Sequence, residues 1–301
     1  MNTNDLKIFE SVAAHKSFTK AASEMFTVQS NVTARIRSLE EEFGTELFNR
    51  TSRKVELTPA GEILMRYSKQ VAGLVTEAKA SILNADKVAG ILRIGCIETT
   101  MALKAPEILT QFEEKYPGVE LEFKSAMRAA LIDDVLNYDL DAAYVSAPVN
   151  ISGLDQIAVK QEELVILSAS RGPELKDLLA GQPVKIVVFA EGCVFRARLE
   201  AWLSSKGIVH YKSTVLNSIE GIINFVEAGL GITVLPEEIV STYYPGRKIR
   251  MQSLNKQLGI MNTVLIYRKD DKPSRALEAF LGLHPNIQKS TGNSKMDSLG
   301  Y

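Results

Sequence analysis

The sequence has few cysteines and no long apolar run, and each absence excludes a class of protein. Only Cys96 and Cys193 occur among 301 residues, which argues against a disulfide framework and is typical of a reducing cytosol. No stretch approaches the roughly 18 uninterrupted apolar residues of a membrane-spanning helix. The first residues, MNTNDLKIFESVAAHKSF, lack the cationic and apolar regions of a secretory signal. We therefore expect a soluble, cytoplasmic protein with no membrane contact.

Motifs that carry catalysis or bind metals are missing as well. The three histidines, His15, His210 and His284, are scattered without metal-ligand spacing, and HExxH is absent. GxSxG, GxxxxGK[ST] and GxGxxG do not occur either. The sequence thus predicts no enzyme activity, no catalytic residue, no metal site and no cofactor.

Charge does not identify a binding partner. The length favours two or three compact units, and 46% hydrophobic with 24% charged residues is ordinary for globular proteins. Net charge is −1, and residues 1–58 contain eight basic and eight acidic residues. DNA binding would require local clustering of basic side chains, with the acids at positions 40–42 turned elsewhere. The basic residues available for such a cluster are Arg35, Arg37, Arg50, Arg53 and Lys54.

Residues 4–44 carry the pattern of three short helices. Apolar side chains recur at helical spacing over residues 4–14. Ser17 is a good N-cap for a second helix, whose consecutive alanines would let a neighbouring helix approach closely. Thr27 offers a cap for a third helix, which ends before Gly44. The inward stripe of this third helix consists of Val32, Ile36 and Leu39.

Polar side chains cover the outward face of the third helix. They are Gln29, Ser30, Thr33, Arg35 and Arg37. Glutamine can bond bidentately to adenine, arginine to guanine, and hydroxyl groups to bases or phosphate. This face is therefore suited to a DNA major groove, although a solvated polar face is the alternative for such a helix taken alone.

The next segment predicts a basic wing. LFNRTSRKVELT alternates as two short strands around a Thr-Ser-Arg-Lys tip, which places Arg50, Arg53 and Lys54 on one hairpin. Such a hairpin suits contact with phosphates or with the minor groove. Three helices followed by a basic wing form a specific combination, and it predicts DNA binding.

The run SFTKAASEMFTVQSNVTARIRSLEEEFGTELFNRTSRKVELTPAG resembles the N-terminal domain of the LysR-type transcriptional regulators. The matching positions are Phe9, Ser17, Phe18, Ala21, Ala22, Gln29, Val32, Ile36, Leu39, Glu40, Gly44, Leu47, Phe48, Arg50, Leu57, Thr58 and Gly61. Ser30 and Thr33 depart from the proline and serine common in the family, and both bear on operator preference. The resemblance implies a winged helix-turn-helix domain over residues 1–58 that binds double-stranded DNA.

A long helix follows over residues 59–88. Thr58 and Pro59 form its N-cap and first position, and only Gly73 interrupts it before about Asp86. Apolar residues recur along it at intervals of three and four positions, as in a helical seam: Leu64, Tyr67, Val71, Leu74, Val75, Ala78 and Ile82. We interpret it as a linker helix that dimerises the protein, which would then read a dyad-symmetric operator. Packing of this seam against the chain's own C-terminal part is the alternative.

From residue 91 onwards, strands and helices alternate. Apolar strands separated by helices predict an α/β fold with a mostly parallel sheet covered on both faces. The order of elements resembles the two-lobe, periplasmic-binding-protein-like effector domain of the same family, over residues 91–285. We expect lobe I at about 91–161 plus 264–285, lobe II at about 162–263, and a disordered tail at 286–301.

Candidate effector contacts follow the ends of strands, where two such lobes would face each other. Lobe I supplies Thr99, Thr100, Ser146 and Pro148, and lobe II supplies Cys193, Phe195 and Arg196. Hydroxyl groups, helix N-termini and an arginine favour a small carboxylate or another anion. Each hydroxyl could instead be a helix cap, and the arginine could form a surface ion pair.

The favoured prediction is a LysR-type regulator that responds to a small effector and forms a dimer or tetramer. One rival is a thiol-redox response through Cys96 and Cys193, because a thiol near a helix N-terminus has a lowered pKa. The simpler alternative to a redox role is that each cysteine is a small, buried hydrophobic residue. A second rival, from another class, is a small-molecule-binding module or enzyme with an accessory N-terminal domain. The missing signal peptide and catalytic motifs speak against it.

Overall fold

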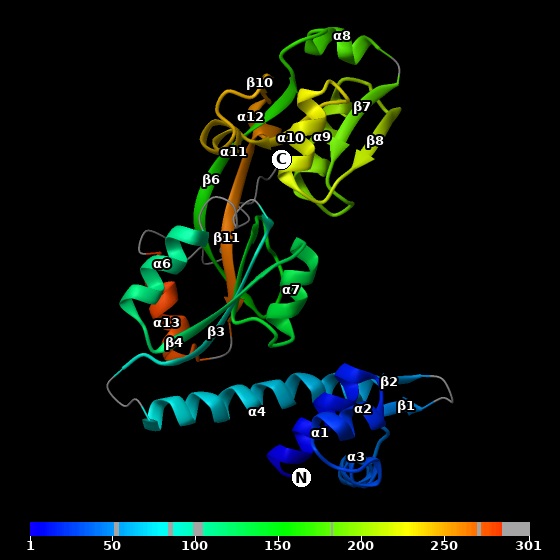
Figure 1. Ribbon diagram of the computed structural model, residues 1–301, viewed down its shortest axis with the longest axis vertical. Coiled ribbons are helices and arrows are strands. Elements are labelled where there is room, and N and C mark those ends of the chain that lie inside the picture. Colours follow the sequence, from blue (N-terminus) through cyan, green and yellow to red (C-terminus); the bar gives the residue numbers. More distant parts are fainter. Residues whose placement is uncertain (51–53, 84–86, 99–104, 182, 270–271, 285–301) are drawn as a thin grey trace, which may run out of the picture. The chain divides into compact units, whose positions relative to one another are not determined.

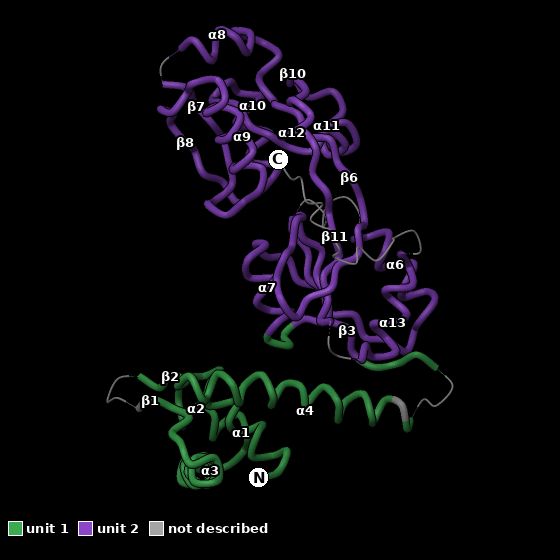
Figure 2. Tube along the Cα trace, turned by 180° about the vertical axis from the view of Figure 1, so that it is seen from behind, with its two compact units in different colours: residues 1–90, 137–139 green, residues 91–136, 140–301 purple. Residues whose placement is uncertain are grey.

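The computed structural model describes residues 1–50, 54–83, 87–98, 105–181, 183–269 and 272–284. The chain divides into an N-terminal unit, residues 1–90 with 137–139, and a C-terminal unit, residues 91–136 with 140–301 (Figure 2). No helix within the described ranges is long and apolar enough to cross a membrane. The predicted tail at 286–301 lies outside the described residues.

Three helices build the core of the N-terminal unit, namely α1 (Thr3–His15), α2 (Phe18–Glu24) and α3 (Gln29–Phe43) (Figure 1). The predicted inward stripe of α3 is buried, because Val32, Ile36 and Leu39 are at most 1% exposed. The predicted cap of α2 is confirmed, since the Ser17 hydroxyl accepts the N–H of Lys20 at 3.3 Å. The helical pattern of the sequence therefore specifies this core.

The predicted cap of α3 is wrong. Val28 occupies the N-cap position and provides no side-chain acceptor. The Thr27 hydroxyl instead accepts a hydrogen bond from Nδ2 of Asn31 at 2.9 Å. At the other end, Gly44 has φ of 66°, a left-handed conformation that a glycine adopts without strain and that ends the helix.

The wing is an antiparallel hairpin of β1 (Phe48–Arg50) and β2 (Val55–Leu57), as predicted, with Phe48 opposite Leu57. Its tip, including Arg53, lies outside the described residues. Glu40 on α3 fixes the base of the hairpin, because its Oε1 accepts the N–H groups of Leu47 at 3.0 Å and Phe48 at 3.4 Å.

Helix α4 (Pro59–Leu83) begins at the predicted cap. The hydroxyl of Thr58 accepts the N–H of Gly61 at 3.0 Å and donates to the carbonyl of Glu46 at 2.7 Å. A glycine is required at position 61, because a Cβ there would lie 2.2 Å from the carbonyl oxygen of Leu47. Helix and wing can approach each other only with this residue.

The predicted apolar seam of α4 divides into two parts. Leu64 is 8% exposed, and it and Val71 pack within the N-terminal unit. Leu74 and Ile82, by contrast, are 64% and 79% exposed. Leu64 and Val71 thus belong to the core of their own unit, whereas Tyr67, at 59% exposed, and the later residues of the seam are open.

The C-terminal unit contains a seven-stranded sheet with strand order β10-β6-β11-β5-β3-β4, in which β9 also pairs with β6. Its strands are β3 (Gly90–Cys96), β4 (Val119–Ser125), β5 (Ala142–Ser146), β6 (Leu154–Ala169), β9 (Thr233–Pro236), β10 (Ile249–Ser253) and β11 (Ile260–Arg268). A separate parallel pair consists of β7 (Val184–Val188) and β8 (Tyr211–Val215).

The expectation of a mostly parallel sheet is wrong. Strands β3 and β5 are parallel, but β11 is antiparallel to β5 and β6, and β6 is antiparallel to β9 and β10. The cause is the long strand β6, which runs from one hydrophobic core to a second, and β11, which returns beside it (Figure 1). Two adjacent strands that run between the same two cores in opposite directions are antiparallel.

Those two cores define the lobes of the C-terminal unit. The lobe I core includes Leu131, Val145 and Ile266, and the lobe II core includes Ile166 and Met261. The helices among the described residues of this unit include α6 (Ala105–Lys115), α7 (Arg128–Leu136), α8 (Leu175–Ala180), α9 (Val194–Ser205), α10 (Ile219–Glu227), α11 (Glu237–Tyr243), α12 (Lys256–Gly259) and α13 (Arg275–Leu281). Because β6 and β11 contribute to both cores, they connect the lobes.

Candidate functional site

The first turns of α3 bring three predicted DNA contacts onto one surface. Gln29 and Ser30 are exposed, and Thr33 lies one turn further on. The Thr33 hydroxyl donates to the carbonyl oxygen of Gln29 at 2.9 Å, which leaves its lone pairs available. The side-chain oxygen of Gln29 accepts a hydrogen bond from the Thr19 hydroxyl on α2 at 3.1 Å. Sequence reasoning missed Thr19, because nothing in the pattern shows which residue of α2 meets α3.

The predicted arginine contacts of α3 have partners within the protein. Arg35 Nη1 lies 3.2 Å from Oδ1 of Asp5, a residue of α1 that is only 7% exposed. Arg37 Nε lies 2.9 Å from Oε1 of Glu41, and both side chains are largely exposed. Arg35 therefore ties α3 to α1, whereas Arg37 forms an i,i+4 pair on the surface.

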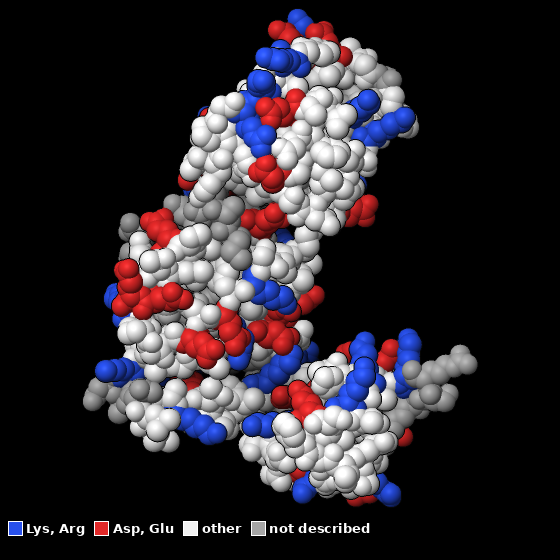
Figure 3. All heavy atoms as spheres, viewed as in Figure 1, with Lys and Arg blue, Asp and Glu red and all other residues white. Residues whose placement is uncertain are grey.

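The acidic residues at the end of α3 also have partners within the protein. Glu40 holds the wing, Glu41 pairs with Arg37, and Glu42 lies 2.7 Å from the N-terminal ammonium, whose pKa this hydrogen bond raises. Lys54, directly before β2, is exposed, and its Nζ lies 3.4 Å from Oε1 of Glu56. Acidic and basic groups are interspersed over this unit in Figure 3. Net charge is therefore a poor guide to its partner.

Two exposed apolar side chains flank the start of α3. Phe26 is 98% exposed with φ of 51°, and Val28 is 65% exposed. Single exposed apolar residues are common on protein surfaces, so these two exposures alone assign no contact. Sequence reasoning assigned neither of them a role.

In lobe I, an arginine that sequence reasoning missed organises the predicted effector residues. Ser146 ends β5 and is 2% exposed, and its carbonyl oxygen accepts Nε of Arg128 at 2.9 Å. The carbonyl oxygen of Pro148 accepts Nη2 of the same arginine at 2.6 Å. The other predicted contacts of this lobe, Thr99 and Thr100, lie outside the described residues.

A carboxylate of lobe I lies at a helix N-terminus of lobe II. Glu98 follows β3, and its Oε1 accepts the N–H of Ile219, the first residue of α10, at 3.4 Å. Burial raises the pKa of Glu98, and the N–H group partly offsets this effect. A helix N-terminus favours an anion, so Glu98 occupies a position that an anionic ligand would prefer.

The predicted contacts of lobe II are not all available. Phe195 is 5% exposed and belongs to the lobe II core, so it does not present its ring to a ligand. Arg196 bonds through Nε to Glu200 at 2.9 Å, and its Nη2 lies 3.7 Å from Glu191. The ion-pair alternative for this arginine is thus observed. Cys193 occupies the N-cap position of α9.

Neither thiol has the lowered pKa that a redox response would need. Cys96 is fully buried, and desolvation raises its pKa to about 12. Burial also raises the pKa of Cys193, although the N–H groups of Arg196 and Phe195 act in the opposite direction. The lowered pKa expected at the start of a helix is therefore wrong for Cys193, and the thiol-redox interpretation loses its physical support.

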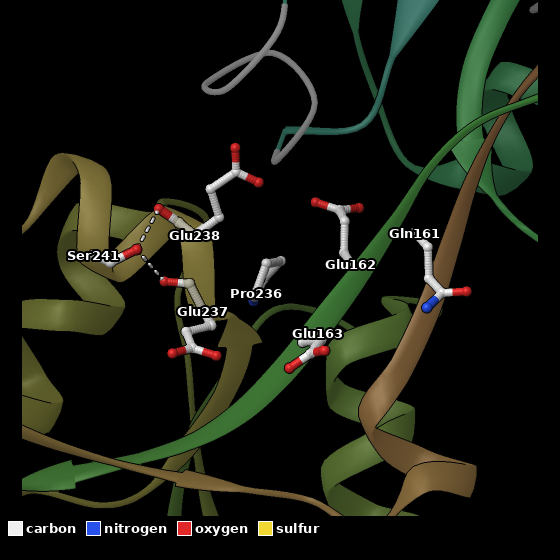
Figure 4. Close-up of a pocket in the computed structure, with 7 residues that line it drawn as sticks. All are labelled: Gln161, Glu162, Glu163, Pro236, Glu237, Glu238 and Ser241. Carbon is white, nitrogen blue, oxygen red and sulfur yellow. Dashed lines mark hydrogen bonds between the residues drawn. The ribbon is translucent and has the colours of Figure 1, made fainter. Parts of the chain in front are cut away.

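A cavity of about 300 Å³ lies where β6 meets the start of α11, and the sequence analysis did not predict it. Its lining is mostly acidic and consists of Gln161, Glu162, Glu163, Pro236, Glu237, Glu238 and Ser241. Glu162 and Glu238 extend to the same side in Figure 4, and Lys160 pairs with Glu238. Glu162 is 7% exposed and accepts a hydrogen bond from Thr263 at 2.7 Å. In the described part of the chain, no cluster of acidic, histidine or cysteine side chains could hold a metal ion.

A winged helix-turn-helix followed by a two-lobe α/β unit is the architecture of DNA-binding transcription regulators with an effector-binding domain. Residues 3–62 match the bacterial regulatory helix-turn-helix protein, lysR family, and residues 85–284 match the LysR substrate binding domain. The chain belongs to the LysR family of transcriptional regulators.

Relatives of known sequence or structure extend over nearly the whole chain. The uncharacterized HTH-type transcriptional regulator YusT of Bacillus subtilis (strain 168) is 36% identical over 299 residues, 99% of this chain and 100% of that one. A full-length OxyR variant from Pseudomonas aeruginosa has 21% identity and a TM-score of 0.70, covering 95% of both chains. CbnR in complex with its target DNA has 18% identity and a TM-score of 0.66, covering 95% of this chain and 99% of that one. These two structures share the fold.

Proposed function

We propose that this regulator binds a dyad-symmetric operator by inserting the first turns of α3 into the major groove. The observation that carries the proposal is the polar surface at the start of α3, where Gln29 and Ser30 are exposed and Thr33 is half-buried. Amide and hydroxyl groups are the side chains that read base edges without requiring a net positive charge. The neutral composition of residues 1–58 is compatible with this mode of recognition.

Basic side chains then fix the protein on the DNA backbone. Arg50, Arg53 and Lys54 contact phosphates from the wing, and Arg37 exchanges its surface partner Glu41 for a phosphate. Arg35 remains bound to Asp5 and keeps α3 in its orientation.

The protein works as a homodimer, or as a tetramer of two dimers, in the cytoplasm. The open part of the α4 seam supports this, because Leu74 and Ile82 expose 64% and 79% of their surface, and the neighbouring Leu83 exposes 80%. Exposed apolar groups recurring along one long helix are typical of helix pairing between subunits. A two-fold dimer would present two α3 helices to the two half-sites of the operator.

A small anionic effector, such as a carboxylate, binds between the lobes. Its negative group takes the place of the Glu98 carboxylate at the N-terminus of α10. Thr99 and Thr100 are the predicted lobe I partners; Ser146, the third predicted hydroxyl, is only 2% exposed and does not present its side chain to a ligand in this arrangement. Binding would then favour one arrangement of the lobes, as any ligand that prefers one state must.

Selection from a randomised duplex library tests the DNA-binding proposal. The wild type should enrich a dyad-symmetric site, and Gln29→Ala should lose about 1–3 kcal/mol of discrimination at one base pair in each half-site. Lys54→Ala should weaken binding to all sequences alike and flatten the salt dependence. An unchanged site preference in Gln29→Ala would overturn the role of Gln29 as a base reader.

Thermal unfolding with a panel of small carboxylates, and with amines as the control panel, tests the effector proposal. A ligand present at about 100 times its Kd stabilises the folded state by about 2.7 kcal/mol. Carboxylates that stabilise the wild type should bind Glu98→Gln more tightly, because the competing charge is gone. Stabilisation by amines alone would contradict the anionic effector.

A further inference from the structure

Two exposed polar side chains from different helices meet at the proposed DNA-reading surface. The Thr19 hydroxyl, on α2, donates to Oε1 of Gln29, the first residue of α3, at 3.1 Å. We infer that Thr19 is a positioning residue, which holds the Gln29 amide in the orientation that reads a base. This inference rests on the proposed function, in which Gln29 contacts DNA.

The bond contributes little to the stability of the fold. Thr19 and Gln29 are both exposed, so water replaces either partner when the bond opens. Its effect lies in the conformations of the glutamine. A free glutamine side chain on a helix surface samples many rotamers, and ordering it on DNA opposes binding. A side chain already held in place loses less freedom when it binds.

The support for this bond is rigid. Threonine is β-branched, so its χ1 angle is restricted and its hydroxyl has few positions. Helix α2 is fixed by the Ser17 cap and by Ala21 and Ala22, which are at most 4% exposed. The acceptor residue stands at the first position of α3. A stiff donor on a packed helix therefore faces a flexible acceptor.

The direction of the bond sets the chemistry that Gln29 presents. Because Oε1 receives the hydroxyl proton, this oxygen faces α2 and Nε2 carries its two donors away from Thr19. An outward amide nitrogen suits an acceptor in the major groove, such as N7 of a purine. The second lone pair of Oε1 remains for N6 of adenine. Thr19 thus selects the amide orientation that matches adenine.

The experiment compares five proteins by library selection and by titration of single-base variants of the selected site. They are wild type, Thr19→Val, Thr19→Ser, Gln29→Ala and the double variant Thr19→Val/Gln29→Ala. Valine keeps the shape of threonine and removes the hydroxyl, whereas serine keeps the hydroxyl. Ser23→Ala is the matched control, because the Ser23 hydroxyl lies on the same helix and donates to the backbone carbonyl oxygen of Thr19. Thermal unfolding of each variant monitors folding.

We expect Thr19→Val to lose about two- to tenfold in discrimination at the base pair where Gln29→Ala loses most. Thr19→Ser and Ser23→Ala should keep the wild-type profile, and the double variant should lose no more than Gln29→Ala. Replacing the adenine there by 7-deazaadenine should weaken wild type and leave Gln29→Ala unaffected. An unchanged profile in Thr19→Val, or equal weakening on every site, overturns the inference while Gln29 keeps its role. An unchanged profile in Gln29→Ala overturns both.

Discussion

The two units differ in the setting of the ionisable groups around their candidate sites. Around α3, charged side chains are bound to partners that hold the helices and the wing, and neutral polar groups occupy the exposed first turn. In the C-terminal unit, Glu98 and Glu162 are carboxylates partly or wholly removed from water, and burial raises the pKa of both. The charges around α3 therefore hold the structure together, whereas the charges of these two carboxylates in the second unit lie where a proton or a ligand can alter them.

Glu40→Ala should have the largest effect and tests the architectural role of charge. The variant removes the acceptor of the N–H groups of Leu47 and Phe48, two residues that are 1% exposed. Leaving buried donors without an acceptor costs about 1–3 kcal/mol, and affinity for all DNA sequences should fall as the wing loosens. Urea unfolding and gel shift measure both. Glu40→Gln retains an oxygen acceptor and should regain most of the stability and affinity lost in Glu40→Ala. If Glu40→Ala behaves like wild type, the charged residues around α3 do not have the structural role given to them here.

Glu162→Gln should stabilise the C-terminal unit at neutral pH. Burial raises the pKa of Glu162, and the Thr263 hydroxyl and the charge of Lys160 offset part of this effect. A carboxyl whose pKa is higher in the folded than in the unfolded state favours folding below the unfolded value, near 4.5, and loses this contribution as pH rises through the folded value. Glutamine stays neutral and keeps an acceptor for Thr263.

The thermal midpoint of Glu162→Gln should therefore exceed that of wild type by about 2–4 °C at neutral pH and approach it near the pKa of a free glutamate. Differential scanning calorimetry across this pH range measures the difference. Glu163→Gln, at an exposed position of the same cavity, is the matched control. A difference that does not change with pH would mean that proton binding at Glu162 is not coupled to folding.

Arg35→Met should have a smaller effect and separates architecture from base reading within α3. The Arg35 side chain is 46% exposed, so the loss of its contact with Asp5 should cost at most about 1 kcal/mol of stability. If Arg35 only orients α3, affinity should decline equally on all sites, and the selected sequence should be that of wild type. A change in the selected base pairs would instead assign Arg35 to base readout, as its position on the polar face first indicated.

The parts of the molecule that sequence predicts well are those set by short-range periodicity. The stripe of Val32, Ile36 and Leu39, the Ser17 cap, the wing strands and the Thr58 cap of α4 all follow from residues within a few positions of one another. The pattern also identifies the exposed face of α3. It does not identify Thr19 or Asp5, because their partners depend on how the helices cross.

Long-range topology explains what the sequence did not predict in the C-terminal unit. Strand β6 begins at Leu154, in a segment whose mixed polar and apolar residues do not resemble a buried strand, and only its apolar end was expected. The mostly parallel sheet was expected because β6 and β11 were not seen to pair. Phe195 was assigned to a ligand from its position after a strand, yet it faces the lobe II core. Which side of a helix faces a core is decided by elements far along the chain.

Glu98→Gln should have the smallest effect, and it tests the difference between the partly buried Glu98 and the buried Glu162. Burial raises the pKa of Glu98, but it is only partly buried, and the N–H of Ile219 stabilises its charged form. The pKa is raised, as it is for Glu162. At neutral pH the thermal midpoint of Glu98→Gln should therefore exceed that of wild type, by less than about 1–2 °C, and the difference should shrink as pH falls. Glutamine keeps an oxygen that can accept the N–H, so a loss of stability would have to come from the missing charge. A midpoint that falls at neutral pH would show that attraction between the Glu98 charge and the N-terminus of α10 outweighs desolvation. Charge would then also be architectural in the C-terminal unit, and the difference between the two units would rest on Glu162 alone.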